Sequence, residues 1–496
     1  MVTEVVHLSE SHLNALNRRR RIIDLGGLME PLGVGPKRWI DYRFSLVDKP
    51  GTQVDSLWWC VDEGNVAYYP SKVLPVQVVS SMKAWFDAGV DILKVMVQET
   101  HKRKLEAFFA YRLNGYDRGD DDIPFEQPMK RQHPDWLIKG AWCPGGLWNF
   151  AVPGVRDYKV SILREVAENY DFDGINIDFA RHPPCLPIGH QWEHRNAMTD
   201  FIRKVRMMLQ EVAKKRGRPF LLSVRVPETV PGCHYDGLDI ETWARQNLID
   251  IIVMGVRSID VDVAGFRRAT AGTHILLFPC IDDAHSTDGY HHPPIEFFRG
   301  AAANWWQEGV DGILTFNFAN VTPEACAAVG FPVGPPSHQQ AYHEIGEPET
   351  IRFKNKIFVV QRRFGAGWEE RWDFYHNNNM QAPLPAVLSS GAMPTILTVN
   401  VADDLIGNSE RLNNIHLRLL LSGAAAGDVI EAKLNGVLLP APKDAGHGWL
   451  IFAPNPRQFA IGRNLVSIRM GQRAGDSKSP VTIEKLEVHV AYSRSS

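Results

Sequence analysis

The residues of this chain that could do chemistry stand where predicted strands give way to loops. Asp178 ends one apolar run, and Glu228 ends the next predicted strand. Because side chains alternate along a strand, Asn176 and Asp178 share one face and the isoleucines beside them share the other. Strands of a parallel sheet are covered on both faces, where a polar residue is costly unless it is used or paired. Asp178 is therefore a candidate catalytic or substrate-binding carboxylate, and an internal ion pair with an arginine is the alternative.

Two carboxylates on adjacent strand ends suit the hydrolysis of a glycosidic bond. One carboxylic acid protonates the leaving oxygen, while the other carboxylate attacks the anomeric carbon or activates water. Asp178 is the leading catalytic candidate, and Glu228 is its preferred partner. Further carboxylates at strand ends could replace either one, and two histidines are possible proton carriers with a structural role as the alternative. These further candidates are Asp24, Glu63, Asp282, Asp283, His133 and His182.

Arginines stand at the ends of four consecutive predicted strands, at Arg112, Arg181, Arg225 and Arg257. The guanidinium fork suits carboxylate and sulfate groups, so this cluster predicts an anionic glycan carrying uronic, sialic or sulfated residues. The alternative is that each arginine neutralises a nearby Asp or Glu. Alternation would place Asn317 inward with Thr315, where it could bind a sugar hydroxyl. The remaining substrate-binding candidates are His182, Glu63, Trp59, Tyr111 and Asp282.

The elements that must position these residues alternate between strands and helices. The predicted strands are 21–25, 54–60, 105–112, the run ending at Asp178, 220–228, 250–257, 274–280 and 312–318. Helices are predicted at 8–20, 76–104, 190–216, 239–247, 260–269 and 295–308, with a further one before Asp178. Eight strands alternating with helices predict an α/β fold, a (β/α)8 TIM barrel, whose active sites lie at the carboxyl ends of the strands.

The sequence texture changes beyond Phe331. Prolines and a polar run predict a linker at 336–350, which separates a barrel at 1–335 from a C-terminal domain at 351–496. Short alternating strands and the Asn435-Gly436 hairpin signal predict a β-sandwich for that domain. It could bind carbohydrate or only pack against the barrel, and we expect the second.

Composition bounds the class of protein. The chain has 496 residues and a net charge of −3, which predicts neither nucleic-acid nor membrane-surface binding. Six scattered cysteines indicate no disulfide framework, and no cofactor is expected. The pattern His190-Gln191-Trp192-Glu193-His194 matches H-x-x-E-H, so a zinc hydrolase using His190 and His194 is a weaker alternative. No secretory signal is recognised, which leaves localisation open, as the sequence also leaves homo-oligomer formation.

Several runs resemble a known family of barrels. These are Val-Pro-Gly-Val-Arg-Asp-Tyr at 152–158, Tyr-Asp-Phe-Asp-Gly-Ile-Asn-Ile-Asp at 170–178, His-Pro-Asp-Trp-Leu at 133–137, the start at 18–23 and Glu-Gly-Val-Asp-Gly at 308–312. They are similar to the glycosyl-hydrolase-like family 10 barrels over about residues 17–320. The resemblance implies a bacterial, glycosidase-like (β/α)8 fold with Asp178 at the family's strand-end aspartate. The residues after Asp178 and after Asp24 depart from the family pattern, so the resemblance implies neither the substrate nor the catalytic partner.

These observations together predict a glycoside hydrolase that cleaves an acidic glycan by carboxylate acid/base chemistry. The alternative from another class is a non-catalytic carbohydrate-binding barrel. Release of sugar by the purified protein would distinguish the two.

Overall fold

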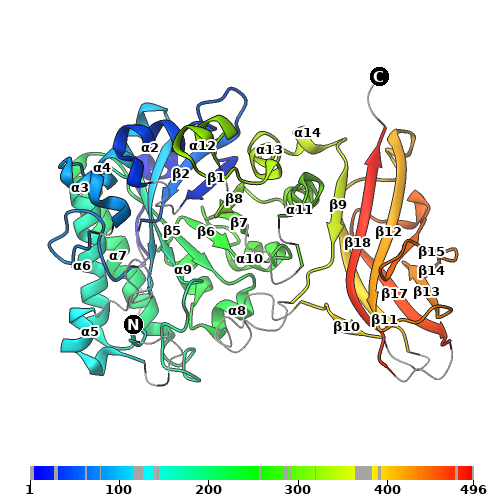
Figure 1. Cartoon of the computed structure of the whole chain (residues 1–496). Coiled ribbons are helices and arrows are strands. Elements are labelled where there is room, and N and C mark those ends of the chain that lie inside the picture. The colour runs from blue at the N-terminus through cyan, green and yellow to red at the C-terminus, as the bar shows by residue number, and fades with distance from the viewer. Residues whose placement is uncertain are drawn as a thin grey trace. The chain divides into compact units, whose positions relative to one another are not determined.

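The computed structural model describes residues 5–26, 32–61, 64–78, 80–115, 127–138, 140, 145–255, 258–282, 289–290, 292–318, 320–363, 382–388, 393–474 and 479–493. Eight parallel strands form a closed barrel, because β1 pairs with both β2 and β8 (Figure 1). They are β1 (Ile22–Gly26), β2 (Val54–Trp59), β3 (Glu106–Arg112), β4 (Gly174–Asp178), β5 (Leu221–Val226), β6 (Ile251–Met254), β7 (Leu276–Asp282) and β8 (Ile313–Phe316). The predicted barrel is confirmed.

Helices alternate with these strands along the chain. They are α1 (Glu10–Leu16), α2 (Pro36–Arg43), α3 (Lys83–Asp87), α4 (Ile92–Lys102), α5 (Pro128–Gln132), α6 (Pro153–Asn169), α7 (Arg195–Arg216), α8 (Val230–Tyr235), α9 (Ile240–Arg245), α10 (Val263–Ala269), α11 (Ile295–Gln307), α12 (Pro323–Val329), α13 (Pro336–Glu344) and α14 (Pro348–Ile351). Local chemistry sets their ends. Asp91 caps α4 by accepting the N–H groups of Leu93 and Lys94, and α7 ends on Gly217 in the left-handed conformation.

Alternate residues of the strands fill the barrel interior. The apolar cluster contains Ile23, Leu25, Trp58, Cys60, Phe108, Ala110, Leu221, Ile251, Val253, Phe278, Cys280, Leu314 and Phe316. Asn176 pairs in register with Ala110, and Ser223 pairs with Asn176, so the polar residues of β4 and β5 lie on this same inward face. The Nδ2 group of Asn176 donates to the hydroxyl of Ser223 at 3.0 Å. The inward direction of Asn176 and Asp178, predicted from alternation, is confirmed.

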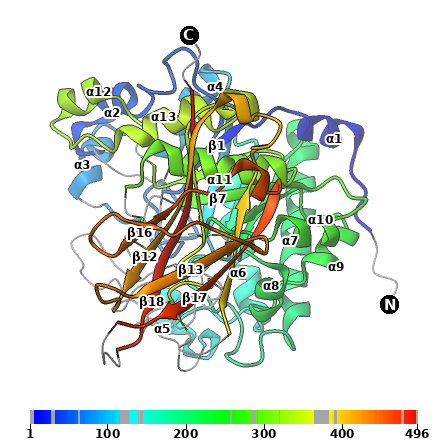
Figure 2. The same ribbon diagram turned by 90° about the vertical axis from the view of Figure 1, so that its right-hand side faces the viewer.

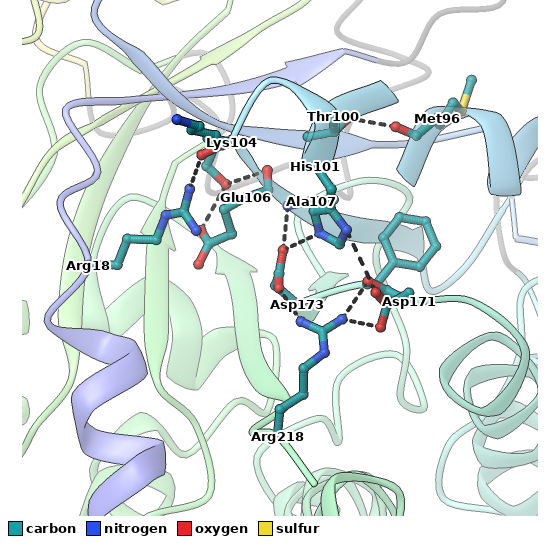
Figure 3. A network of polar contacts seen from close by, with 12 residues as sticks. Arg18, Met96, Thr100, His101, Lys104, Glu106, Ala107, Asp171, Asp173 and Arg218 are labelled. Atoms are coloured by element: carbon teal, nitrogen blue, oxygen red, sulfur yellow. Dashed lines mark hydrogen bonds and ion pairs between the residues drawn. The ribbon is translucent and has the colours of Figure 1, made fainter. Parts of the chain in front are cut away.

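Ion pairs form at the amino ends of the strands, far along β4 from Asp178. Asp173 directly precedes β4 and accepts hydrogen bonds from His101, from the N–H of Ala107 and from Arg218 (Figure 3). Burial would raise the pKa of Asp173, but these donors outweigh it and lower the pKa to about 2. The same end of the barrel holds the bidentate pair between Arg20 and Glu106. Structural ion pairs thus exist in this barrel, and these stand at the end opposite to the candidate site.

The C-terminal region contains two antiparallel sheets, whose main strands are visible in Figure 2. One sheet has the order β10-β18-β12-β16-β15, with β9 also on β18, and the other has the order β11-β17-β13-β14. The strands are β9 (Lys356–Val359), β10 (Ala386–Val387), β11 (Thr395–Val401), β12 (Leu412–Ser422), β13 (Val429–Leu434), β14 (Val437–Leu438), β15 (Lys443–Asp444), β16 (Trp449–Phe452), β17 (Gly462–Gln472) and β18 (Thr482–Tyr492). Asn435 and Gly436 both have positive φ between β13 and β14, as the hairpin prediction requires. The predicted β-sandwich is confirmed.

The segment predicted as a linker is helical. Residues 336–350 include α13 and most of α14, and Tyr342 of α13 is fully buried. The chain divides into two compact units, of which the second contains residues 284–309, 343–369 and 379–496, so α11 belongs to it. The domain boundaries at 335 and 351 remain a prediction.

Among the described helices, none combines the length and apolar character needed to cross a membrane.

Candidate active site

Three charged residues lie side by side at the carboxyl end of the barrel. In the strand pairing, Arg112 of β3 is the partner of Asp178 of β4, and Asp178 is the partner of Arg225 of β5. All three belong to the inward-facing set of their strands. A carboxylate therefore stands between two guanidinium groups on three consecutive strands, at the end where barrel enzymes hold their catalytic groups. We call these residues the Arg112–Asp178–Arg225 row.

Hydrogen bonds fix both oxygens of the Asp178 carboxylate. Its Oδ1 accepts the backbone N–H groups of Ala180 and Arg181, each at 3.0 Å. Its Oδ2 accepts from Nη1 of Arg225 at 3.2 Å. The side chain of Asp178 is 4% exposed and that of Arg225 is fully buried, so the pair is screened little by solvent. All these partners are donors, so Asp178 is held as an acceptor.

Arg225 joins three elements of the barrel. Besides Asp178 it donates from Nε to the carbonyl oxygen of Gly255, at 3.2 Å, and its guanidinium lies 4.2 Å from the centre of the Phe316 ring. Burial by itself would lower the pKa of Arg225, but the pKa is raised, with Cys280, Asp178 and Asp282 as the opposing neighbours. Burial also raises the pKa of the Cys280 thiol to about 12, so this thiol stays protonated at neutral pH. The two carboxylates therefore provide the stabilising charge.

The other described arginines of the site, Arg112 and Arg181, differ from Arg225 in their surroundings. Burial lowers the pKa of Arg112, and the positive charges of Arg181 and Arg225 act in the same direction. These arginines are thus close enough to repel one another across Asp178. Arg181 is half-buried, and its Nε is a buried donor with no hydrogen-bond partner among the described residues. This Nε leaves Arg181 with donor capacity for a bound anion.

Asp282 and Asn317 extend this cluster. Asp282 ends β7, is fully buried and acts electrostatically on Arg225. Asn317 follows β8 and donates from Nδ2 to Asp282 at 3.3 Å. Asn317 thus reaches an inward-facing residue, whereas the predicted inward direction of Thr315 is wrong, because Thr315 turns toward the helices and bonds to Asp24 and Tyr342. Asn317 has a positive φ of 58°, so strand alternation no longer applies to it.

Glu228 and His182 are buried in the segments that follow β5 and β4. Glu228 is 5% exposed and lies beside Gly255, whose carbonyl oxygen holds Arg225. His182 is 2% exposed, and burial lowers its pKa well below the usual value, with Arg181 and Arg112 adding to the effect. His182 is therefore neutral at physiological pH and suits hydrogen bonding better than the supply of a proton.

Three predicted site residues point away from the barrel interior. Asp24 is buried on the helix side, where Arg43 donates to it at 2.8 Å and the Tyr342 hydroxyl does so at 2.8 Å. Trp59 donates from Nε1 to Thr100 of α4 at 3.1 Å.

The Tyr111 hydroxyl donates to the carbonyl oxygen of Gly64 and accepts from Lys159 of α6. The interior cluster contains strand neighbours of these three residues, so Asp24, Trp59 and Tyr111 point to the opposite face. They pack between the strands and the helices and are removed from the candidate site.

The remaining candidates divide into two groups. His133 ends α5 and stacks on Trp136, with ring centres 4.0 Å apart, and no described contact brings it to the Arg112–Asp178–Arg225 row. Glu63, Arg257 and Asp283 lie outside the described residues, so their assignment stays a prediction.

The H-x-x-E-H pattern does not form a helix. Residues 191–194 are turns, and α7 begins only at Arg195. The exposed His190 pairs with Glu193 at 2.9 Å. The spacing argument for a zinc site required His190 and His194 on one helical face, and it fails here. Within the described ranges, no group of three or more His, Cys, Asp or Glu residues could hold a metal ion.

Sequence reasoning missed the neighbours that complete the site. Gly255 contributes a backbone carbonyl and Phe316 an aromatic face, and neither residue type signals a site from the sequence. Ser223, by contrast, could have been found from its alternation with Arg225 on a strand buried on both faces.

Part of the chain is similar in sequence to known proteins. Residues 45–185, which include Arg112, Asp178 and Arg181, match the model of the family described as Glycosyl hydrolase-like 10. Glycosyl hydrolase YngK of Bacillus subtilis is 32% identical over 120 residues, 24% of this chain and 23% of that protein. Glycosyl hydrolase DigH of Escherichia coli is 30% identical over 135 residues, 25% of this chain and 30% of that protein. The matches thus span less than a third of the relatives' own length.

Solved structures that match part of this chain include glycosidases of low sequence identity. The α-L-fucosidase isoenzyme 2 from Paenibacillus thiaminolyticus has a TM-score of 0.45 and 12% identity, with 69% of this chain and 52% of that chain covered. The PgaB (BpsB) glycoside hydrolase domain from Bordetella bronchiseptica has a TM-score of 0.42 and 11% identity, with 62% and 98% covered. The segment that is similar to this family contains Asp178 and the motifs at 152–158 and 170–178.

Proposed function

We propose that this protein is a glycoside hydrolase that cleaves an anionic glycan with Asp178 as the leading catalytic carboxylate. The observation that carries the proposal is the Arg112–Asp178–Arg225 row, in which a buried carboxylate stands between two arginines at the carboxyl end of a barrel. The family match over residues 45–185 supports the hydrolase class, because it covers the strand that bears Asp178.

The hydrogen bonds of Asp178 determine the role that suits it. A protonated carboxylic acid must donate one hydrogen bond, whereas every described partner of Asp178 is itself a donor. Asp178 therefore suits the nucleophile or the base that activates water, and a different residue must protonate the leaving oxygen.

Glu228 is the preferred proton donor. It is buried one strand further on, and burial favours the neutral form of a carboxylic acid. Asp282 is the competing choice because it acts on the same arginine as Asp178. The pH profile distinguishes them, since the alkaline limb of activity reports the essential acid and disappears when that acid becomes an amide.

The arginines support an anionic substrate. Arg181 keeps a buried Nε without a hydrogen-bond partner among the described residues, next to the N–H that it gives to Asp178. A substrate carboxylate or sulfate accepting from Arg181 would lie within reach of the proposed nucleophile. Arg225 is the less available of the two because Asp178 and Gly255 already accept its hydrogen bonds.

Release of reducing sugar from a panel of anionic and neutral glycans tests the proposal. We expect cleavage of an anionic glycan by the wild type and a loss of about 10³-fold or more in Asp178→Asn, as for a group that acts in the transition state. Arg181→Met should raise KM for the anionic glycan with little change for a neutral analogue. The matched control Asp87→Asn changes an exposed carboxylate of α3 and should leave activity unaltered.

The outcomes separate the parts of the proposal. Full activity in Asp178→Asn would remove Asp178 from the chemistry, and equal activity on neutral and anionic analogues would refute the choice of substrate.

A non-catalytic glycan-binding barrel is the second candidate. One observation favours it, namely that Asp178 already accepts three hydrogen bonds from the protein itself. A binder would raise its Tm in the presence of a glycan without releasing sugar. Turnover that depends on Asp178 would rule this candidate out.

A further inference from the structure

A polar pocket of about 390 Å³ opens in the second compact unit, and none of its lining residues belongs to the barrel row. It lies among α11, α14, β9, β18 and the segment that follows β11. Its wall and floor include Trp306, Arg352, Lys356, Asp403, Asn408 and Tyr492. The volume falls within the range of about 300–1,000 Å³ that small-molecule sites occupy.

A fixed charge pair forms the floor of the pocket. The side chain of Lys356 is fully buried and that of Asp403 is 10% exposed, and they are 3.0 Å apart. The hydroxyl of Tyr492 donates to the same oxygen of Asp403 at 2.6 Å. The Lys356 ammonium group also donates hydrogen bonds to the carbonyl oxygens of Arg352 and Lys354. The second oxygen of Asp403, Oδ1, has no hydrogen-bond partner in the described part of the chain, so the floor offers one rigid acceptor.

An aromatic side chain forms one wall. Trp306 of α11 is half-buried, and its Nε1 donates to the carbonyl oxygen of Ile345 at 2.8 Å, which fixes the ring. No ring or cation of the described residues stacks on this indole. A flat apolar face beside polar groups suits a ligand that is apolar on one side and rich in hydroxyls on its edge.

The rim adds amide groups with hydrogen-bonding capacity left. Asn408 uses Nδ2 to reach the carbonyl oxygen of Asp404 at 2.8 Å, which leaves its Oδ1 as an acceptor. Gln307 is exposed, and its side chain makes no hydrogen bond to another described residue. Three carboxylates line the pocket against two cations, since Glu349 and Asp404 join Asp403 opposite Arg352 and Lys356. The single excess negative charge disfavours an anionic ligand.

We infer that this pocket binds a neutral sugar ring, as a site separate from the barrel row. The ring's C–H face lies on Trp306, and its hydroxyl groups donate to Asp403 Oδ1 and to the rim amides. The excess negative charge of the pocket favours a neutral ligand over an anionic one. The proposed preference of the barrel row is the opposite, because arginines dominate there. The inference does not rest on the proposed hydrolase activity, because no residue of the Arg112–Asp178–Arg225 row lines the pocket.

Ligand-observed NMR and calorimetry with the full-length Asp178→Asn protein test the inference without turnover. The probes are the methyl glycosides of glucose, galactose, mannose and N-acetylglucosamine, with glucuronate as the anionic comparison. We expect at least one neutral probe to bind and glucuronate to bind at least roughly tenfold more weakly. Trp306→Ala should weaken binding roughly tenfold, the effect of losing an aromatic face.

Two further variants keep the test decisive. Gln307→Ala changes an exposed side chain, so it preserves the fold and should still weaken binding. Trp449→Ala, which removes a half-buried tryptophan of β16 outside the pocket, should leave binding unchanged. Because Arg181 of the barrel could also hold glucuronate, binding is assigned to the pocket only where Trp306→Ala weakens it. The inference is overturned if no neutral probe binds, if glucuronate binds the pocket as tightly by this criterion, or if both pocket variants bind like the parent.

Discussion

Replacing Arg225 by methionine is the sharpest test of how the barrel row is held. The substitution keeps an unbranched side chain but removes the one side chain among the described residues that donates to Asp178. Removing one member of a buried ion pair costs about 3–5 kcal/mol because the other charge stays buried. Asp178 keeps the N–H groups of Ala180 and Arg181, so we expect the lower end, about 3 kcal/mol, in the free energy of unfolding.

An exposed ion pair supplies the matched control. Lys83 and Asp87 lie 2.6 Å apart, closer than the 3.2 Å of the buried pair, but their side chains are 68% and 62% exposed. Solvent and side-chain entropy reduce such pairs to about 0.3–0.5 kcal/mol, so Lys83→Met should change stability by no more than that. Burial, and not distance, decides which of the two pairs matters.

Urea unfolding followed by tryptophan fluorescence measures both variants. The double variant Arg225→Met with Asp178→Leu should recover part of the loss, because no charge is then left without a partner. A loss below about 1 kcal/mol in Arg225→Met would refute the reasoning, since Asp178 would then not depend on this partner. A double variant less stable than the sum of the single ones would also contradict it.

Two further predictions concern residues outside the barrel row. Asp173 has a pKa lowered from 3.8 to about 2, so its contribution of about 2 kcal/mol is complete above pH 3.8 and is lost as the pH falls through 2. Asp173→Asn should flatten the acid limb of stability between these pH values, and an unchanged limb would contradict the assignment. Tyr342→Phe removes a hydrogen bond to the buried Asp24 and should cost about 1–3 kcal/mol without lowering kcat. Lost turnover at unchanged stability would return Asp24 to the chemistry.

The barrel could be predicted because its signal is repeated along the chain. Eight apolar runs separated by helical patterns leave few alternatives, and the inward face of β4 followed from the alternation of Asn176 and Asp178. The ends of the strands were less predictable. The fifth and sixth strands were expected to extend to 228 and 257, whereas β5 ends at Val226 and β6 at Met254.

There is a physical reason why the sequence could not predict which way the Asp24 side chain points. All residues of β1 are buried, so hydrophobicity does not distinguish the face toward the interior from the face toward the helices. One partner that accommodates Asp24 comes from far along the chain, since Tyr342 is 318 residues away. The helix that carries Tyr342 was itself predicted as a linker, because its prolines and polar residues resemble those of a connecting segment.

The site also differs from its prediction in what each arginine does. Four equivalent arginines were expected from their positions at strand ends. The structure shows Arg225 bonded to Asp178 and Gly255 and Arg181 with an unused Nε, a distinction that depends on the Gly255 carbonyl and on the turn after Asp178. Backbone groups of this kind carry no signal in the sequence.

The row of charges has a consequence for how the barrel assembles. A shift of β4 by one residue against its neighbours would turn Asp178 toward the helices and bring an apolar side chain between Arg112 and Arg225. Two like charges would then be enclosed without their counter-ion, at a cost of several kcal/mol. The same three residues thus select the one alignment in which β4 closes the barrel. Changes at Asp178 are therefore expected to alter the fidelity of folding as well as the proposed chemistry.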